Sequence, residues 1–364
     1  MRHHPFSLDL TRPLGTASGD ISRREGFVIT VGSEAEDSTA TGLGEATPLP
    51  GWTESRDACA AALDGLERPD TDDGDGSGES LAAALDAAST PAARHGVSLA
   101  VADAAARDAD RSLAERLVDE AGIDSRPADS VPVNATVGDG PPSETAETAE
   151  RVVAEGFDCL KVKVGAREID ADVGRMRAVR EAVGDGVALR ADANGAWDRS
   201  TARRALDALA PLDLAYVEQP LPADDLEGLA ALRGEGPGGR VPIAADESVA
   251  RHGIDAVVDA GAADAAILKP MALGGPDRAL AAATRALAAG VEPVVTTTID
   301  AVVARTAAVH VAAAIPDVSA CGLATGTLLD EDLAPDPCPV TDGAVRVPAG
   351  PGLAGGAFDG LRRS

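Results

Sequence analysis

Short apolar runs alternate with longer Ala-rich segments over residues 131–326, and this alternation leaves few folds open. The apolar runs are VPVNATV, CLKVKVG, VALRADANG, LAYVEQP, VPIAADES, AAILKP, VEPVVTTTI and VSACGLATG. Their lengths and β-branched residues are typical of buried strands, and each run except the last precedes a segment with helical periodicity. Eight β-α repeats within about 200 residues predict a barrel of parallel strands surrounded by helices.

An open, doubly wound sheet is the alternative arrangement for such repeats. Its nucleotide-binding forms need a glycine-rich phosphate loop of the type G-x-G-x-x-G after the first strand. The stretch VNATVGDGPPSE, which contains the end of the first predicted strand, does not have this pattern. The barrel is therefore the expected fold.

The segments before and after the repeats have different patterns. FSLDL and GFVITVGS indicate strands within residues 5–50, whereas residues 54–122 are rich in Ala and Leu with helical periodicity. The polar stretch ERPDTDDGDGSGES between two of these helices indicates an exposed loop. We expect a self-contained α+β domain at residues 1–128, a barrel at 129–336, and a C-terminal segment at 337–364 that returns to the first domain.

Charged residues stand at the carboxyl ends of five consecutive predicted strands. In chain order they are Lys163, Asp192, Glu218, Asp246 and Lys269. Of the 32 basic residues only three are lysines, and the third, Lys161, shares a strand face with Lys163. Each short motif is common by itself. Their regular order predicts that the five side chains meet at the C-terminal mouth of the barrel, where barrel enzymes carry out their chemistry.

Three carboxylates that converge on one point repel each other and require a cation. We expect Mg²⁺, with Mn²⁺ as an alternative, because hard divalent ions prefer oxygen ligands. The sequence places no histidine or cysteine at these strand ends, which disfavours zinc and copper. A neighbouring ammonium and a metal ion make a lysine a better base near neutral pH. Lys163 is therefore the candidate base for a proton next to a carboxylate, and Lys269 would face it from the opposite side.

These motifs resemble those of the enolase superfamily, in its muconate-lactonizing subgroup. The matching stretches are EATPLPGWTES (45–55), LKVKVG, LRADANGAW (189–197), VEQP, ADES, LKP and TTTID (296–300). The resemblance covers nearly the whole chain. It implies a modified TIM barrel, (β/α)7β, with an N-terminal α+β capping domain that the C-terminal segment completes.

The resemblance also implies roles for the charged residues. It assigns Asp192, Glu218 and Asp246 to the metal ion. It makes Lys163 the acid and base that exchanges protons with the substrate. Lys269 would stabilise an enediolate, and Lys161 would lie near the substrate carboxylate.

Other positions are expected, on the same resemblance, to surround the substrate. The residues expected to line it are Arg190, Asn194, Thr297, Thr298 and Gly322. Glu247 would lie behind the metal ligands. The loops at residues 16–20 and 49–52 would close over the mouth, although spacing alone would make them ordinary hairpin turns.

Within the superfamily, the chain is most similar to the o-succinylbenzoate synthases, lyases of menaquinone biosynthesis. This implies dehydration of 2-succinyl-6-hydroxy-2,4-cyclohexadiene-1-carboxylate to o-succinylbenzoate through an enediolate. The alternative is an N-acylamino acid racemase or dipeptide epimerase in which Lys163 and Lys269 are opposed bases. Many synthases have other residues in place of KPMALGG and VEQP, so these two stretches do not decide between the two substrates. The stretch ACGLATGTLL lacks an acidic anchor for the amino group of a dipeptide, which favours the synthase. A non-catalytic barrel would be expected to have lost at least one of the five charged residues.

The composition limits the classes of partner that the protein is expected to bind. A formal net charge of −28, spread along the chain, argues against binding to nucleic acid or anionic lipid, so a small carboxylate substrate is the expected partner. No oligomeric state is predicted. The acidic excess and scarcity of lysine indicate a halophilic cytoplasm. The absence of a C-x-x-C pair, of a membrane-length apolar run and of a signal-peptide pattern also favours a cytoplasmic location.

Overall fold

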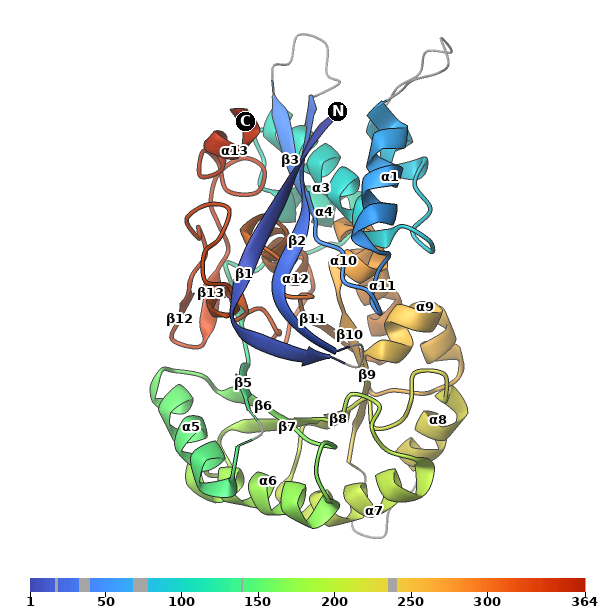
Figure 1. The fold of residues 1–364 in the computed structure, drawn as a ribbon, viewed down its shortest axis with the longest axis vertical. Helices are drawn as coiled ribbons and strands as arrows, with labels where there is room; N and C mark the ends of the chain where they lie inside the picture. Colours follow the sequence, from blue (N-terminus) through green and yellow to red (C-terminus); the bar gives the residue numbers. More distant parts are fainter. Residues whose placement is uncertain (17–18, 33–39, 68–77, 139, 235–240, 364) are drawn as a thin grey trace.

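The computed structural model describes residues 1–16, 19–32, 40–67, 78–138, 140–234 and 241–363. A curved, seven-stranded parallel sheet and its helices form one part of the molecule, and a three-stranded antiparallel sheet with helices forms the other (Figure 1). Both chain ends lie at the end of the molecule that carries the antiparallel sheet (Figure 1). The predicted exposed loop lies mostly outside the described residues.

The parallel strands lie side by side in the order in which they follow along the chain. They are β5 (Ala135–Val137), β6 (Cys159–Lys163), β7 (Ala188–Asp192), β8 (Tyr216–Glu218), β9 (Ile243–Ala245), β10 (Ala265–Leu268) and β11 (Glu292–Val295). These are the first seven strands that the sequence predicts. Together with the closure described below, they confirm the modified TIM barrel.

Helices connect the strands and cover the outside of the sheet (Figure 1). They are α5 (Pro142–Ala154), α6 (Ile169–Val183), α7 (Arg199–Leu209), α8 (Leu226–Gly234), α9 (Glu247–Asp259), α10 (Pro270–Leu273), α11 (Pro276–Ala288) and α12 (Val302–Ala313). Two 3-10 turns, η1 (Ala210–Leu212) and η2 (Gly326–Leu328), also occur. On β6, Val162 is buried in the same cluster as Met176 of α6, so the alternate lysines face the barrel interior, as expected.

The eighth predicted strand closes the barrel with two residues only. Cys321 pairs in parallel with Val133, just before β5, and Gly322 pairs with Thr296, just after β11. The Gly322 amide donates to the Val295 carbonyl at 2.9 Å. A side chain at position 322 would place its Cβ 2.5 Å from Thr296 Oγ1, so the closure requires glycine there.

A small apolar cluster fills the barrel below the charged strand ends. It consists of Tyr216, Ala244, Ala265, Ile267 and Val294, all of them buried. Tyr216 and Ala244 each precede a charged residue, Glu218 and Asp246, by two positions and therefore face the same interior. The barrel thus has an apolar floor and a charged rim.

The described residues of the N-terminal part form a β-meander and four helices. The elements are β1 (Arg2–Thr16), β2 (Gly19–Gly32), β3 (Thr41–Ala46), α1 (Arg56–Glu67), α2 (Gly78–Ala83), α3 (Pro91–Asp108) and α4 (Leu113–Ala121). A Cβ at Gly42 or Gly44 would lie 1.9 Å from a carbonyl oxygen of α3. Glycines at these positions of β3 therefore allow the helix to pack directly on the strand.

The N-terminal part and the barrel share buried apolar surface. Val28, Leu43 and Leu99 belong to the same buried cluster as the barrel strands and helices. The N-terminal part therefore packs against the barrel through this shared core. The domain bounds stay a prediction.

The C-terminal segment ties the two parts together. Strands β12 (Val340–Thr341) and β13 (Ala344–Arg346) form a small antiparallel sheet with β4 (Ser130–Pro132), and helix α13 (Asp359–Arg363) follows. Arg362 Nη2 donates to the buried carboxylate of Asp103 on α3 at 2.9 Å. The same carboxylate accepts the backbone amides of Leu43 and Leu353 at 2.9 and 2.8 Å, so one acid holds β3, α3 and the C-terminal segment.

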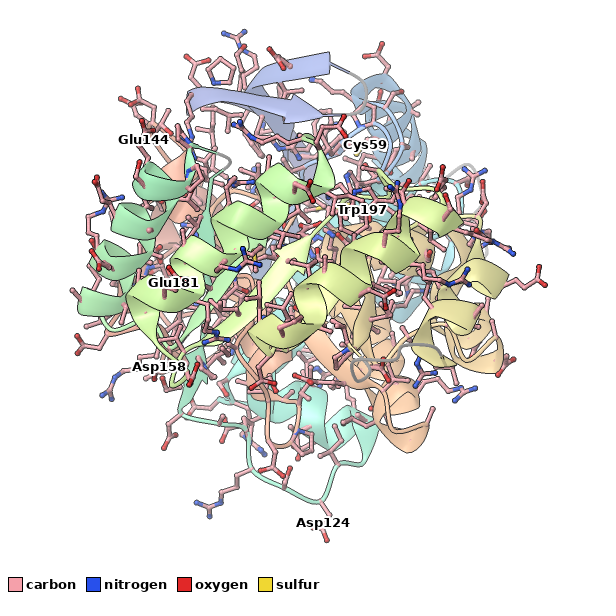
Figure 2. The ribbon with its side chains drawn as sticks, turned by 90° about the horizontal axis from the view of Figure 1, so that it is seen from below. Cys59, Asp124, Glu144, Asp158, Glu181 and Trp197 are labelled. Atoms are coloured by element: carbon pink, nitrogen blue, oxygen red, sulfur yellow. The ribbon has the colours of Figure 1, made fainter. Side chains whose placement is uncertain are left out.

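Acidic side chains are spread over the outer surface. Asp124, Glu144, Asp158 and Glu181 are exposed and lie at separate places on the molecule in Figure 2. No helix among the described residues is both long and apolar enough to cross a membrane.

Candidate active site

The five charged residues lie together at the carboxyl ends of the strands. In the parallel pairing, Lys163 on β6 is the partner of Asp192 on β7, and Asp192 is the partner of Glu218 on β8. Asp246 and Lys269 directly follow β9 and β10. The three carboxylates are almost fully buried. The structure therefore brings the predicted charges to one rim of the barrel.

The two lysines of β6 have different surroundings. Lys161 Nζ lies 3.1 Å from Asp192 Oδ2 and donates to both Glu218 oxygens at 3.0 and 3.2 Å. Lys163 Nζ donates to Asp192 Oδ2 and Asn194 Oδ1, both at 2.7 Å. The Lys163 side chain is 39% exposed and that of Lys161 only 16%. Lys163 is the more accessible of the two to an incoming molecule.

Lys269 follows β10 and therefore approaches the acids from the side opposite to β6. Its ammonium forms an ion pair with Asp246. The same Nζ lies 3.8 Å from the centre of the Trp52 ring, which comes from the loop after β3. A cation over an indole face is attracted by the ring quadrupole. The 49–52 loop therefore reaches the charged rim, as expected, whereas residues 17 and 18 of the 16–20 loop lie outside the described residues.

Polar side chains behind the rim hold the strand-end turns in place. Gln219 is fully buried, and its Oε1 accepts the backbone amides of Asp246 and Ser248 at 2.9 and 3.1 Å. Asn194 donates from Nδ2 to Glu247 Oε1 at 3.2 Å, and its backbone amide donates to Asp192 Oδ1 at 3.1 Å. Asn194 and Gln219 have positive φ values of 45° and 39°. The chain thus bends sharply within two residues of Asp192 and directly after Glu218.

Burial is the largest single influence on the pKa values of the three acids. Burial, followed by repulsion from Asp192, raises the pKa of Glu218 to about 8. Burial also raises the pKa of Asp246 against the attraction of Lys269. For Asp192, the attraction of Lys161 and Lys163 outweighs burial and holds the pKa below its ordinary value. Burial disfavours the charged form of Lys161, but Asp192 and Glu218 hold its pKa well above the usual range.

The donor set of this rim suits a hard divalent cation. Within the part of the chain that the structure describes, no three His, Cys, Asp or Glu side chains form a ready-made metal cage, and lysine ammonium groups contact the carboxylates. Asp192, Glu218 and Asp246 nevertheless supply oxygen ligands from consecutive strands. Oxygen ligands of this kind are the ones that Mg²⁺ and Mn²⁺ prefer.

Arg190 lies at the level of Lys161, below the strand ends that carry the acids. Its guanidinium carbon lies 4.7 Å from the centre of the Tyr216 ring, and Nη1 donates to Asn134 Oδ1 and the Ala320 carbonyl at 3.2 and 2.7 Å. Only 4% of Arg190 is exposed. These contacts connect β7 to the residue just before β5 and to the residue just before the closing pair Cys321 and Gly322. The contact of Arg190 with a substrate remains a prediction.

The remaining predicted residues follow β11 or belong to the barrel closure. Thr297 Oγ1 lies 3.0 Å from Thr325 Oγ1, and Thr298 Oγ1 donates to Asp300 Oδ1 at 2.5 Å. Gly322 takes part in the closure itself. The structure places all three beyond the carboxyl end of β11, and their role toward a substrate stays a prediction.

Sequence patterns could indicate some of these residues but not their partners. Gln219 stands next to a predicted ligand in VEQP, and this position is the signal that could have identified it. The Trp52 contact joins residues that are 217 positions apart in sequence, and no local pattern indicates such a contact.

A barrel with acids on three successive strands, lysines on both sides and a capping domain is the architecture of an enolase-superfamily enzyme. The family model described as "Enolase C-terminal domain-like" matches residues 144–355, and the chain belongs to this family. The match covers more than half of the chain and confirms the resemblance to the superfamily.

Individual relatives have different activities. The chain is 44% identical over 214 residues to an o-succinylbenzoate synthase of Thermobifida fusca, a match of 57% of this chain and 64% of that protein. It is 35% identical to a hydrophobic dipeptide epimerase of Enterococcus faecalis over 74% of this chain and 72% of that one. A dipeptide epimerase of E. faecalis solved with Mg and L-Leu-L-Tyr has a TM-score of 0.84 and 27% identity, over 97% and 98% of the two chains. The chain thus spans slightly less than two thirds of the length of the synthase.

Proposed function

We propose that this protein is an o-succinylbenzoate synthase, a lyase that removes water from 2-succinyl-6-hydroxy-2,4-cyclohexadiene-1-carboxylate. The observation that carries α-proton removal, the step that this proposal requires, is the placement of Lys163 and Lys269 on opposite sides of three buried carboxylates at the barrel mouth. Similarity to the T. fusca synthase supports this choice of substrate.

Asp192, Glu218 and Asp246 would hold Mg²⁺ or Mn²⁺. When bound, the ion would supply a positive charge that stabilises the carboxylate of the substrate as its α-proton leaves. The E. faecalis epimerase, with a similar fold, was solved with Mg, which supports a divalent ion at this position. Asn194 and Gln219 would keep the ligand-bearing turns in place through the hydrogen bonds described above.

Lys163 would carry the proton in both directions. Its neutral amine would take the proton from the carbon next to the carboxylate, and the resulting ammonium would give it to the departing hydroxyl group. The products are o-succinylbenzoate and one water molecule, and the amine is restored. The greater exposure of the Lys163 side chain supports this assignment over Lys161.

The other residues would orient the substrate and balance its charge. Lys269, held between Asp246 and Trp52, would present a positive charge to the developing enediolate. Lys161 would stay paired with Asp192 and Glu218 near the substrate carboxylate. Arg190, Thr297, Thr298 and Gly322 would line the remainder of the site.

The second candidate is a dipeptide epimerase or N-acylamino acid racemase. It is favoured by the similarity to epimerases over nearly the whole chain and by the two lysines on opposite sides of the rim. In that reaction one lysine would remove the α-proton and the opposite one would return a proton to the other face.

Direct assays separate the two candidates. The purified protein with Mg²⁺ is given the cyclohexadiene carboxylate, and the aromatic absorbance of the product is followed. Hydrophobic dipeptides are incubated in D₂O in parallel, and deuterium at the α-carbon is measured by mass spectrometry. Formation of o-succinylbenzoate at rates far above any dipeptide exchange supports the synthase. Exchange into dipeptides without dehydration would replace it with the epimerase.

A further inference from the structure

The turn that follows β11 contains a strained residue. Ile299 has a φ of 60°, in the left-handed region, although it is β-branched and only 9% exposed. Such a conformation costs about 1–3 kcal/mol in a non-glycine residue and persists only where neighbouring groups hold it. The described contacts identify two of these groups, and both belong to the antiparallel sheet of the N-terminal part.

The first of them is Arg24 of β2. Its Nε donates to the Ile299 carbonyl at 3.1 Å, and its two terminal nitrogens donate to the Pro48 and Thr47 carbonyls at 3.1 and 2.8 Å. The Arg24 side chain is buried, with 3% of the residue exposed. A planar guanidinium with three fixed hydrogen bonds joins the strained peptide to the chain segment that follows β3.

The second is Glu45 of β3, which is fully buried. Its Oε1 accepts the Ala301 amide and its Oε2 accepts the Ala304 amide, both at 2.8 Å. These amides are at the N-terminus of α12, where an anionic side chain is favourable. Thr47 Oγ1 donates to the same carboxylate at 2.5 Å. Residues from the N-terminal part therefore fix both the strained peptide and the helix directly after it.

The turn held in this way carries two of the residues predicted to line the substrate. Thr297 Oγ1 accepts the Ile299 amide at 3.3 Å, and Thr298 Oγ1 donates to Asp300 Oδ1. The Thr297 hydroxyl is thus tied to the Ile299 backbone amide and the Thr298 hydroxyl to the Asp300 side chain. A change in this backbone would move both groups at the mouth of the barrel.

We infer that Arg24 and Glu45 are positioning residues of the active site, which hold the 297–300 turn in a strained conformation so that Thr297 and Thr298 face the substrate. This inference rests on the proposed function, because a substrate contact of the two threonines is part of that proposal. It makes the antiparallel sheet part of the framework of the site, in addition to the loop that carries Trp52.

The test compares Arg24→Lys and Glu45→Gln with a matched control, Asp103→Asn. Lysine keeps the charge of Arg24 but cannot form three fixed hydrogen bonds. In Glu45→Gln, the side-chain NH₂ group would face one of the two backbone amides that donate to Glu45, and that hydrogen bond would be lost. Asp103 is also fully buried and accepts two backbone amides and one side chain, from Leu43 of β3 and from the C-terminal segment, and none of these bonds reaches residues 296–304.

We measure KM and kcat for the cyclohexadiene carboxylate, the melting temperature, and amide hydrogen exchange in residues 296–304. For Arg24→Lys and Glu45→Gln we expect KM to rise about tenfold, as for the loss of one charge-assisted hydrogen bond, with faster exchange in this segment. Asp103→Asn is expected to lower the melting temperature comparably, while KM and exchange in the segment stay at the wild-type values.

Relief of the strain provides a second, independent readout. Glycine adopts positive φ without steric cost. Adding Ile299→Gly to Arg24→Lys should therefore bring the raised KM of Arg24→Lys part of the way back to the wild-type value. If the control raises KM as much as Glu45→Gln does, or if Ile299→Gly gives no recovery, the positioning role is wrong. If Glu45→Gln does not fold, Arg24→Lys and the double variant decide the question.

The hydrogen-exchange result keeps the two proposals apart. Should the wild-type protein fail to dehydrate the substrate, the proposed function is wrong, and exchange in residues 296–304 still shows whether Arg24 and Glu45 hold the turn. Unchanged exchange in both variants would overturn the inference whatever the activity.

Discussion

The ammonium of Lys269 lies between the Asp246 carboxylate and the face of the Trp52 ring. Asp246 belongs to the barrel and Trp52 to the loop after β3, so both parts of the molecule contact one lysine. Leu49 O accepts the amides of Trp52 and Thr53, both at 2.9 Å, and Gly51 supplies the positive φ that this tight turn needs. The loop that presents Trp52 is therefore built by local hydrogen bonds.

Replacement of Trp52 should impair turnover in proportion to the loss of this cation–π contact. A contact of this kind is worth about 0.5–2 kcal/mol, so we expect Trp52→Leu to lower kcat/KM about tenfold. Trp52→Phe keeps an aromatic face and should lose less than about threefold. Steady-state kinetics with melting curves for each variant test this. Equal losses in the two variants would show that volume, and not the aromatic face, is what matters.

Removal of the Lys163 amine should abolish proton transfer with little change in stability. Its side chain is 39% exposed, and a partly exposed ion pair contributes little to folding. We expect Lys163→Met to lower kcat about a thousandfold, within the range typical of general acid–base catalysis. Lys163→Arg keeps the charge but not the base and should be equally inactive. Activity above a tenth of wild type in either variant would remove Lys163 from its proposed role.

Ion binding can be tested without measuring turnover. A ligand that binds only the folded state at 100 times its Kd adds about 2.7 kcal/mol of stability, so Mg²⁺ should raise the melting temperature of the wild-type protein. Asp192→Asn should lose this response. Asp198→Asn changes an exposed carboxylate that caps α7 and should keep it. An identical response of wild type and Asp192→Asn would exclude Asp192 as a ligand.

The barrel could be predicted from sequence because its signals are local and repeated. Each strand is a short apolar run, and five consecutive predicted strands end in a charged residue, among them Lys163 and Asp192, which the parallel pairing places side by side. The closing strand was predicted at full length, yet only Cys321 and Gly322 pair with the neighbouring segments. Periodicity identifies a run that can form a strand but not how many of its residues find partners.

Contacts between distant segments could not be predicted in the same way. The Arg24–Ile299 hydrogen bond joins positions 275 residues apart. A β-branched residue is also a poor indicator of positive φ, so the sequence around Ile299 predicts a continuing strand rather than a sharp turn. The sequence shows the motifs EATPLPGWTES and TTTID, but the hydrogen bond from the Ala301 amide, just after TTTID, to Glu45 depends on how the two parts pack.

His310 should make stability depend on pH in the acidic range. It is fully buried on α12, where Nδ1 accepts the Ala114 amide at 3.3 Å and Nε2 donates to the Leu353 carbonyl at 2.6 Å. Burial lowers its pKa from 6.5 to about 4, so the unfolded chain binds the proton more tightly. The contribution of neutral His310 is therefore complete above pH 6.5 and is lost as pH falls through 4. Its size is about 3 kcal/mol.

Glu45 changes stability in the opposite direction over part of the same range. Burial and then Asp300 raise its pKa from 4.5 to about 7, so its contribution is present below pH 4.5 and is lost as pH rises through 7. The two effects offset each other in the wild-type protein between about pH 4.5 and 6.5. The comparison with a His310 variant is therefore more informative than the wild-type profile alone.

We expect His310→Gln to be less stable than wild type at pH 7.5, because two buried hydrogen bonds are disturbed. The difference in unfolding free energy should shrink by about 3 kcal/mol as pH falls to 4, since only the wild type loses the histidine contribution. Urea unfolding at several pH values measures this difference, with His4→Gln at an exposed position as the control. A constant difference across the range would mean that His310 does not resist protonation in the folded state, and the hydrogen bonds to Ala114 and Leu353 would need another explanation.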